Sequence, residues 1–391
     1  MSSLTAKVPV KIGDKIRLKI DRLSYNGGRG VGRFDGGLVV FVSDTAPDEL
    51  AEVEITTIKK NFAEAQLLQI IEPSPYRRES PCPVAQKCGG CTWQHIHYDE
   101  QLRQKEQLLK RNLDLAIKKA NRSTAYNFQM IAAPQEFRYR NRVQVHVKNS
   151  SFGFYEKNSR NLVAINDCLI AEKALLEHFP KNLDDGTYEL SFDGSSQRHI
   201  RRIDDSGPAF SQVNTQQNGA LQESVLRYIE QISPQPIHLF DFYCGSGNLS
   251  FPVLTRFESL AATGVESSPE AVTRAREIAK SSGFQSRAEF IPGDALQYLR
   301  KLRQNDASQS VFILDPPRAG LGKKVIFELT RVHPRGVILV SCDLGALERD
   351  VGLLLDTFTL EEVTAIDMFP QTEYLEIVCL FLPRGAQKLC D

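Results

Sequence analysis

The second half of the chain carries the feature that most constrains the fold. Beyond residue 206, apolar runs typical of strands alternate with stretches typical of helices. Four of these runs are IHLFDFY, AATGVE, SVFILD and GVILVSC. Because each strand–helix–strand crossover places a helix on one face of a parallel sheet, the alternation predicts a doubly wound α/β domain, at residues 208–391. Residues that follow its strands should gather at the carboxyl edge of the sheet, where such folds bind ligands.

The N-terminal part of the chain has the pattern of a small β domain. A chain of 391 residues exceeds what one hydrophobic core usually organises, so more than one domain is expected. Over residues 1–72, Ile16, Leu18 and Ile20 alternate with polar residues, glycines interrupt the chain, and strand character resumes at residues 38–42 and 53–55. The pattern predicts strands that close into a small barrel.

A third region, residues 73–207, is predicted to be a β-rich central domain. It opens with the proline-rich stretch EPSPYRRESPCP, which is typical of a linker. A helix is expected from Asp99 to Lys119, with Asp99 as N-cap and with Leu102, Leu109 and Leu113 on one apolar stripe. Strand-like patterns return at VQVHV, SFGFY, LVAI and YELSF.

Charge limits where a nucleic acid could bind. The 48 Lys and Arg equal the 48 Asp and Glu, so only a local basic patch could attract a polyanion. Residues 101–142 hold ten basic residues against three acidic ones, which suits RNA phosphates, although a solvated helix face explains the run equally well. The ten are Arg103, Lys105, Lys110, Arg111, Lys118, Lys119, Arg122, Arg138, Arg140 and Arg142. Arg198, Arg201 and Arg202 are candidates for the same role.

Apolar runs long enough to span a membrane are missing from the sequence. A spanning helix needs roughly 20 apolar residues, and no run approaches that length. The start, MSSLTAKVPVKIGDK, also has no apolar segment typical of a signal peptide. We therefore expect a cytoplasmic protein, acting as a monomer.

A glycine turn in the C-terminal domain suggests a cofactor site. In IHLFDFYCGSGNLS a buried strand enters a turn with two glycines and then a helix, which lets the backbone approach a ligand. Glu266 ends the next strand, where a carboxylate can accept both hydroxyl hydrogens of a ribose. Asp294 in PGDALQYL stands where an adenine amino group would lie, but taken alone it also fits a helix N-cap.

Two further strand ends carry reactive groups. ILDPPRAGL ends a strand in Asp315, and its prolines fix the backbone so that the acid projects from the carboxyl edge. The next strand ends in Ser341-Cys342-Asp343, which places a thiol on the same edge. A cysteine in that position is more often inert and buried, but beside a methyl donor it has a chemical use. Carbon 5 of uracil cannot attack a sulfonium methyl until a thiolate adds at carbon 6 and converts the ring to an enolate.

These motifs together resemble known families. DFYCGSGN and VESS resemble the first two motifs of class I methyltransferases, and YNGGRGVGRFDGGLVVFV resembles the TRAM domain, an OB-like barrel of RNA-modifying enzymes. DPPR, SCD followed by LERD, and DMFPQT followed by an acid resemble the TrmA-like family of RNA 5-methyluridine methyltransferases. The resemblance covers nearly the whole chain.

The resemblance implies a function and a set of site residues. The fold would be a TRAM barrel, a central domain with a four-cysteine site and a Rossmann-like methyltransferase domain. Cys342 would be the nucleophile, Glu376 the base that removes the hydrogen from carbon 5, and Asp315 a ligand near donor and uracil. Phe210 would lie near the base. The S-adenosylmethionine pocket would be lined by Gln212, Tyr243, Gly245, Asn248, Glu266, Asp294 and Asp315.

The sequence departs from the family pattern at two places. Asp343 and Leu344 stand where the family commonly has Asn and Pro after the nucleophile. Tyr374-Leu375-Glu376 stands in place of His-Val-Glu. Neither change removes a reacting group.

Four cysteines form a candidate metal site. Cys82, Cys88 and Cys91 follow the spacing C-x5-C-x2-C, and Cys168 could be a distant fourth ligand. Four thiolates suit tetrahedral zinc or an iron–sulfur cluster, and spacing alone slightly favours zinc. The resemblance implies a 4Fe-4S cluster instead. The remaining cysteines, Cys244, Cys379 and Cys390, are expected to be bystanders.

Two other functions fit parts of the sequence. An RNA cytosine carbon-5 methyltransferase also needs a cysteine and could use Cys244, although Glu376 and the order of DPPR and SCD argue against it. An RNA-binding factor with an inactive methyltransferase domain is the second, against which the retained Cys342, Glu376 and Asp315 argue. The resemblance favours 23S ribosomal RNA as the target, with the transfer RNA T-loop as the alternative.

Overall fold

The computed structural model describes residues 10–180, 182–192, 197–203 and 212–385, and the chain divides into two compact units. Unit 1 consists of Met1–Leu108, Gln135–Pro208 and Phe369–Tyr374. Unit 2 consists of Leu109–Pro134, Ala209–Met368 and Leu375–Asp391. Two residues discussed above, Phe210 and Cys390, lie outside the described residues. The division of the chain at residues 72 and 207 remains a prediction.

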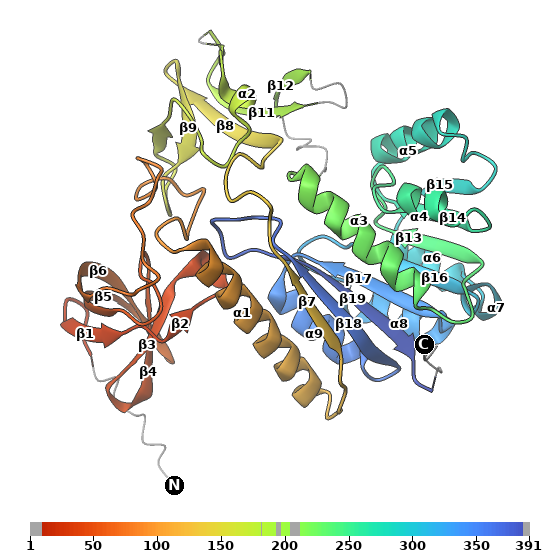
Figure 1. Ribbon diagram of the computed structural model, residues 1–391, viewed down its shortest axis with the longest axis horizontal. Coiled ribbons are helices and arrows are strands. Elements are labelled where there is room, and N and C mark those ends of the chain that lie inside the picture. Colours follow the sequence, from red (N-terminus) through yellow and green to blue (C-terminus); the bar gives the residue numbers. More distant parts are fainter. Residues whose placement is uncertain (1–9, 181, 193–196, 204–211, 386–391) are drawn as a thin grey trace. The chain divides into compact units, whose positions relative to one another are not determined.

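The N-terminal sheet of unit 1 confirms the predicted barrel. It has six strands in the order β1-β5-β6-β4-β3-β2, and β1 also contacts β3, so the sheet curls on itself around a core of alternating apolar side chains (Figure 1). Gly32 in β3 permits that contact, because a Cβ there would lie 2.3 Å from the carbonyl oxygen of Lys19. The strands are β1 (Lys15–Lys19), β2 (Arg22–Leu23), β3 (Gly30–Phe34), β4 (Leu38–Val42), β5 (Leu50–Ile58) and β6 (Phe62–Glu72).

The second sheet of unit 1 confirms the β-rich central region. Its five strands are antiparallel, in the order β10-β9-β8-β11-β12, and a short helix that the sequence did not predict, α2 (Lys173–Leu176), contacts β11. Its apolar side chains form a separate core. The strands are β8 (Arg142–Lys148), β9 (Ser151–Tyr155), β10 (Leu162–Ala164), β11 (Gly186–Phe192) and β12 (Arg198–Arg202).

Unit 2 is the predicted doubly wound domain, built on one eight-stranded sheet in the order β15-β14-β13-β16-β17-β19-β18-β7. The first five strands of that order are parallel, β19 is antiparallel to both of its neighbours, and β7 joins the edge. The strands are β7 (Asn127–Ile131), β13 (His238–Phe242), β14 (Ala261–Glu266), β15 (Ala288–Pro292), β16 (Ser310–Leu314), β17 (Gly336–Ser341), β18 (Phe358–Ile366) and β19 (Glu376–Pro383).

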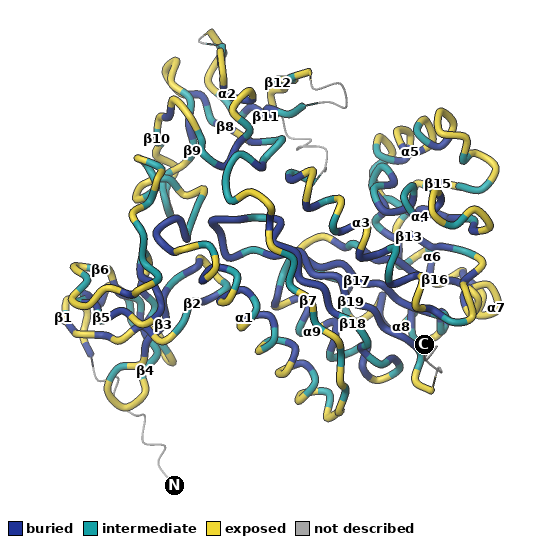
Figure 2. The backbone as a smooth tube through the Cα atoms, viewed as in Figure 1, coloured by how far each residue is buried: buried dark blue, intermediate teal, exposed yellow. Residues whose placement is uncertain are grey.

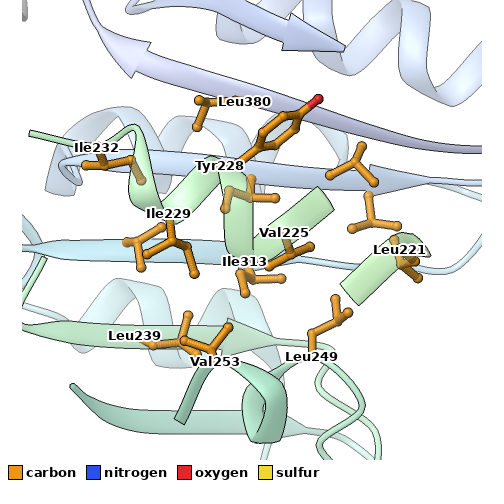
Figure 3. Close-up of a cluster of buried hydrophobic side chains, with 14 of the residues drawn as sticks. Leu221, Val225, Tyr228, Ile229, Ile232, Leu239, Leu249, Val253, Ile313 and Leu380 are labelled. Atoms are coloured by element: carbon orange, nitrogen blue, oxygen red, sulfur yellow. The ribbon is translucent and has the colours of Figure 1, made fainter. Parts of the chain in front are cut away.

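Helices cover this sheet and bury its strands. The central strands β16, β17 and β19 are buried almost throughout, as strands between two helical layers should be (Figure 2). Leu221, Val225 and Ile229 of α3 pack with Leu239 and Ile313 of the sheet (Figure 3). The helices are α3 (Thr215–Glu230), α4 (Ser250–Arg256), α5 (Pro269–Ser281), α6 (Ala295–Lys301), α7 (Gln304–Ala307), α8 (Gly322–Val332) and α9 (Leu344–Leu354).

Helix α1 (Tyr98–Lys119) confirms the predicted helix with two corrections. It begins before Asp99, which therefore lies in the first turn, where its charge complements the helix dipole, and is not the N-cap. Lys105, assigned above to the basic patch, has no exposed surface. Its Nζ donates to the carbonyl oxygen of Phe369 at 3.2 Å. Among the described helices, none is both long enough and apolar enough to cross a bilayer.

Candidate active site

The three reacting residues expected from the sequence meet at one edge of the sheet in unit 2. Asp315 directly follows β16, and Cys342 directly follows the neighbouring strand β17. Glu376 is the first residue of β19, which runs antiparallel to β17, so its beginning lies at the carboxyl edge of the parallel strands. Ser341 pairs with Ile377, and one step further the register sets Cys342 opposite Glu376.

The site is a buried group of acids with one guanidinium. Glu376 is 4% exposed, and burial followed by the charge of Asp315 raises its pKa well above the usual range, while Arg318 opposes the rise. Burial also raises the pKa of Cys342 to about 12, helped by the carboxylates of Glu376 and Asp315, and again opposed by Arg318. The sulfur is therefore held as a thiol in the free protein. Burial likewise raises the pKa of Asp315.

Two residues of helix α9 hydrogen-bond the loop that carries Asp315 and Arg318. The Oδ2 of Asp350 accepts the N–H of Leu321 at 2.7 Å, and its Oδ1 accepts the Nε of Arg349 at 2.8 Å. Arg349 in turn donates from Nη2 to the carbonyl oxygen of Ala319 at 2.7 Å. The LERD motif thus braces the DPPR loop, a role that the sequence analysis had not assigned to either residue.

Asp343, which departs from the family pattern, caps helix α9. It has extended backbone angles, and its side chain accepts the N–H of Ala346 at 2.8 Å. Asp and Asn are equally good N-caps, so the exchange preserves the local geometry. It adds a negative charge that raises the pKa of Cys342, as a lesser contribution after burial and nearer charges. Leu344, the first helical residue, is buried.

The glycine turn after β13 is pinned to the end of β14. Glu266 accepts the N–H of Gly245 at 3.1 Å through Oε2 and the N–H of Ser268 at 2.8 Å through Oε1. Tyr243 has φ of +63°, an uncommon conformation for a bulky residue, which turns the chain into this loop. Gly245 also has positive φ, +54°, as the predicted turn requires. The turn and the acid are thus next to each other.

The other predicted cofactor residues lie around this turn or before helix α3. Asp294 is the N-cap of α6 and accepts the N–H of Gln297 at 2.9 Å, so it does have the capping role that its sequence context allowed. Burial and the charge of Asp294 raise the pKa of Tyr243 to about 12. The Asn248 side chain exchanges hydrogen bonds of 2.9 Å with Asn218. Gln212 lies two residues before Asn214, the N-cap of α3.

Asp241 is a site residue that the sequence analysis missed. It is 1% exposed near the end of β13, and its Oδ2 accepts the hydroxyl of Ser250 at 2.6 Å, whereas its buried Oδ1 has no hydrogen-bond partner within the described part of the chain. Burial raises its pKa to about 7, and Ser250 opposes the rise. Its place as the first residue of DFYCGSGN was the available signal. An acceptor buried beside a glycine turn suits a ligand with a donor group.

Cys244 does not face the reacting group. It is 6% exposed and packs in an apolar cluster with Val272, Ala275 and Phe290, under helix α5. A Cβ on Gly264 would lie 2.8 Å from its sulfur, so the space around it is closed. Burial raises its pKa above the usual range. This packing argues against a cytosine mechanism through Cys244, and Cys379 in β19 is fully buried.

The four candidate metal ligands lie in one neighbourhood of unit 1. Cys82 raises the pKa of Cys88, and Cys88 and Cys168 both raise that of Cys91, though burial is the largest cause for each thiol. Among the described residues, however, no three such side chains are close enough to hold a metal ion together. The four thiols are near one another, but their present arrangement is not that of a metal site.

Hydrogen-bond donors surround these sulfurs. The N–H of Gly90 donates to Cys88 Sγ at 3.4 Å, and the side chain of Gln94 does the same for Cys91. Burial raises the pKa of the Cys168 thiol. Hydrogen bonds with backbone groups of Ala171 and Ile170 lower this pKa by a smaller amount. Donors aimed at sulfur favour the thiolate form that metal groups require. The donor set fits a four-thiolate group once the sulfurs approach one another.

The basic segment divides into buried and exposed members. Besides Lys105, Arg142 is withdrawn from solvent, since its side chain is 10% exposed and pairs with Glu189. Arg138 pairs with Asp167 at 2.5 Å. The expectation that the whole run faces RNA is wrong for Lys105. Exposed members remain in the second half of α1 and just after it: Arg111, Lys118, Lys119 and Arg122.

Comparisons with known proteins identify relatives for both units. Residues 190–384 match the model of the tRNA (Uracil-5-)-methyltransferase family, and residues 9–68 match the TRAM domain. An uncharacterised RNA methyltransferase of Bdellovibrio bacteriovorus is 37% identical over 95% of this chain and 96% of its own. The tRNA (uracil(54)-C(5))-methyltransferase of Schizosaccharomyces pombe is 27% identical over 95% of this chain and 79% of its own.

One solved structure shares the fold over nearly the whole chain. The crystal structure of Pyrococcus abyssi tRNA (uracil-54, C5)-methyltransferase in complex with S-adenosyl-L-homocysteine covers 94% of this chain and 100% of its own, with a TM-score of 0.69. The sequence identity is 21%, so this likeness concerns the fold.

Proposed function

The chain belongs to the TrmA-like family of RNA uracil-5-methyltransferases with a TRAM domain, and from this membership we propose that it methylates carbon 5 of a uridine through a covalent adduct at Cys342. As a member it is an S-adenosylmethionine-dependent RNA methyltransferase. The observation that carries the proposal is the convergence of Cys342, Glu376 and Asp315 at one sheet edge, beside Arg318.

The proposed mechanism gives Cys342 and Glu376 successive tasks. The Cys342 thiol gives its proton to solvent water, and the resulting thiolate adds to carbon 6 of uracil, which makes carbon 5 an enolate carbon. S-adenosylmethionine supplies an electrophilic methyl group, so a carbon–carbon bond forms at carbon 5 while the methyl–sulfur bond breaks. Glu376 then takes the proton from carbon 5, and the electron pair left behind restores the 5,6 double bond and expels Cys342 as thiolate.

The electrostatics of the site suit these tasks. A Glu376 whose pKa is raised by burial and by Asp315 is a stronger base than an exposed glutamate. Cys342, in contrast, must lose its proton before it can react, which a lower pKa favours. Arg318 is the neighbouring cation that lowers the pKa of Cys342. We propose that Arg318 favours the thiolate when uracil enters.

The cofactor would lie along the glycine turn. Glu266 holds the turn and would accept the ribose hydroxyls, while Asp294 and Tyr243 would flank the adenine. The buried Oδ1 of Asp241 has no hydrogen-bond partner among the residues that the structure describes, and it would accept a donor from the bound molecule. Gln212, Gly245 and Asn248 complete the proposed pocket.

Two substitutions test the mechanism because they stop it at different steps. Cys342→Ala should abolish methylation while S-adenosylmethionine still binds, since the ring never becomes nucleophilic. Glu376→Gln should transfer the methyl group and then remain attached to methylated RNA, because the proton on carbon 5 stays. A denaturing gel with labelled RNA should show a shifted band for Glu376→Gln and none for Cys342→Ala. Cys244→Ala is the matched control and should keep turnover; methylation by Cys342→Ala would refute the adduct.

The target is proposed to be 23S ribosomal RNA, on the family resemblance of the TRAM-plus-cysteine architecture. The transfer RNA T-loop is the second candidate, because the two relatives named above with an assigned target are tRNA uracil-54 methyltransferases. Mapping 5-methyluridine in both RNAs from a strain that lacks the gene decides between them. Loss from 23S RNA alone supports the first candidate, and loss from the T-loop alone replaces it with the second.

We further propose that Cys82, Cys88, Cys91 and Cys168 bind a 4Fe-4S cluster, supported by their neighbourhood and by the donors aimed at three of the sulfurs. When bound, the cluster would supply binding energy that holds this part of unit 1 folded. Protein purified without oxygen should contain about four irons per chain. One zinc per chain, or no metal, would overturn the assignment. Cys379→Ser, outside the set, should leave the iron content unchanged.

A further inference from the structure

The loop that precedes the proposed base is part of unit 1, although the strands on both sides of it belong to unit 2. Strand β18 ends at Ile366, which pairs with Glu376, the first residue of β19. Between them the six residues Phe369–Tyr374 are grouped with unit 1. Glu376 therefore lies two residues after a loop whose own contacts are made within unit 1.

The backbone of Gln371 anchors this loop. Its carbonyl oxygen accepts the N–H groups of Thr92 and Trp93, each at 3.0 Å. Its own N–H donates to Oε1 of Gln101 at 3.0 Å. The residue has φ of +69° and no exposed surface. A non-glycine residue holds this conformation only where the surrounding contacts enforce it.

The side chain of Gln371 is equally engaged. Its Oε1 accepts the Nε2 of Gln101 and the Nη2 of Arg78, each at 3.0 Å. Its Nε2 donates to Oε2 of Glu136 at 3.1 Å. Every polar atom of the residue is thus used, and its partners come from three separated stretches of unit 1.

Neighbouring residues add further ties. The carbonyl oxygen of Pro370 accepts the hydroxyl of Tyr139 at 3.0 Å. Glu373, 1% exposed, accepts the hydroxyl of Thr92 at 2.7 Å. Connecting loops usually lie on the surface and move more than the strands they join, whereas this one is buried and fixed at several positions.

A fixed loop has a specific use here. A base must lie within hydrogen-bond reach of the proton that it removes, and a displacement of about 1 Å can cost about a hundredfold in rate. Glu376 is also buried near Asp315, and two carboxyl groups in such a place repel each other when ionised. Glu376 is the first residue of its strand and only four residues separate it from Gln371, so a shift of the loop backbone would be passed along the chain to Glu376.

We propose that Gln371 is a positioning residue that sets the place of Glu376 for removal of the carbon-5 proton. The inference rests on the proposed role of Glu376 as base. It assigns Gln371 to one step, because Cys342 addition and methyl transfer precede proton removal. A displaced base should therefore slow release of the methylated RNA and leave formation of the adduct nearly unchanged.

The test measures formation and release separately in the full-length enzyme. Tritiated S-adenosylmethionine and total RNA from a strain that lacks the gene are mixed with excess enzyme, and tritium is followed in protein-linked and in free RNA. For Gln371→Ala we expect adduct formation close to that of the unaltered enzyme and release slower by roughly 10- to 100-fold. Gln371→Glu keeps the bonds from Gln101 and Arg78 but sets a second carboxylate against Glu136 in place of the donor, so its release should also be slowed.

Two further variants separate the causes. Gln104→Ala is the matched control: Gln104 is 2% exposed in unit 1, and its side chain bonds Leu23 and Glu100 and not the loop, so its loss should destabilise without trapping adduct. Glu376→Gln is the reference for a missing base. If Glu376→Gln traps adduct and Gln371→Ala releases normally, or slows formation and release alike, the positioning role is wrong. If Glu376→Gln traps none, the base assignment itself fails. Should Gln371→Ala not fold, normal release by Gln371→Glu overturns the inference.

Discussion

The brace between Asp350 and the DPPR loop leads to a prediction for Asp350→Ala. Asp350 is 1% exposed and holds the N–H of Leu321 at 2.7 Å, and Leu321 is itself buried at 6% exposure. Removal of the carboxylate leaves that N–H buried without its partner, which costs about 1–3 kcal/mol. The lost pair with Arg349 adds less, about 0–1 kcal/mol, because the Arg349 side chain is 42% exposed. We expect the free energy of unfolding to fall by about 1–4 kcal/mol.

The same substitution should also affect catalysis. The loop positions Asp315 and Arg318, so a loosened loop should lower kcat by about tenfold or more, even at temperatures where the variant is folded. Urea unfolding followed by circular dichroism gives the stability change, and methyl transfer at saturating RNA gives kcat. Asp356→Ala is the control, since Asp356 is an exposed acid 3.6 Å from Arg122 and should change stability by less than about 0.5 kcal/mol.

A double-mutant cycle with Gly320 tests the geometry itself. A Cβ on Gly320 would lie 2.4 Å from Oδ2 of Asp350, and Gly320 has φ of +73°. Gly320→Ala should therefore destabilise the protein, and by less when Asp350 is already alanine, because the clash with the carboxylate is gone. Additive effects, or an unaltered kcat in Asp350→Ala, would refute the reasoning that α9 braces the catalytic loop.

Two other predictions concern RNA binding and pH. The triple variant Arg111→Gln, Lys118→Gln, Lys119→Gln should flatten the slope of log affinity against log salt by about 2–3, measured by filter binding, whereas the exposed Lys280→Gln should not; an unchanged slope would exclude these three as phosphate contacts. Burial raises the pKa of Asp241 from 3.8 to about 7, so its contribution to stability is complete below pH 3.8 and is lost as pH rises to 7. Between pH 4 and pH 8 the free energy of unfolding of the unaltered protein should therefore fall by up to about 4 kcal/mol relative to that of Asp241→Asn. Equal pH profiles of the two proteins would contradict the raised pKa.

The parts of the fold that the sequence predicted are those encoded by local periodicity. The alternation of strands and helices predicted the doubly wound sheet, and the strand ends then placed Asp315 and Cys342 at one edge. Glu376 was harder to place, because its strand runs antiparallel and only the register of Ser341 with Ile377 puts it opposite Cys342. The burial of Lys105 was missed, since its charge favours exposure even though the helical period places it on the same face as Leu102 and Leu109; in the fold its ammonium is satisfied by the carbonyl oxygen of Phe369.

Residues that act through other residues were invisible for the same reason. Nothing in LERD or FPQT shows that Asp350 supports a distant loop or that Gln371 is bonded by residues far from it in sequence. Thr92 and Trp93, which bind the Gln371 carbonyl, directly follow Cys91. Roles of this kind depend on hydrogen bonds between residues far apart in sequence, which neither periodicity nor motif spacing encodes.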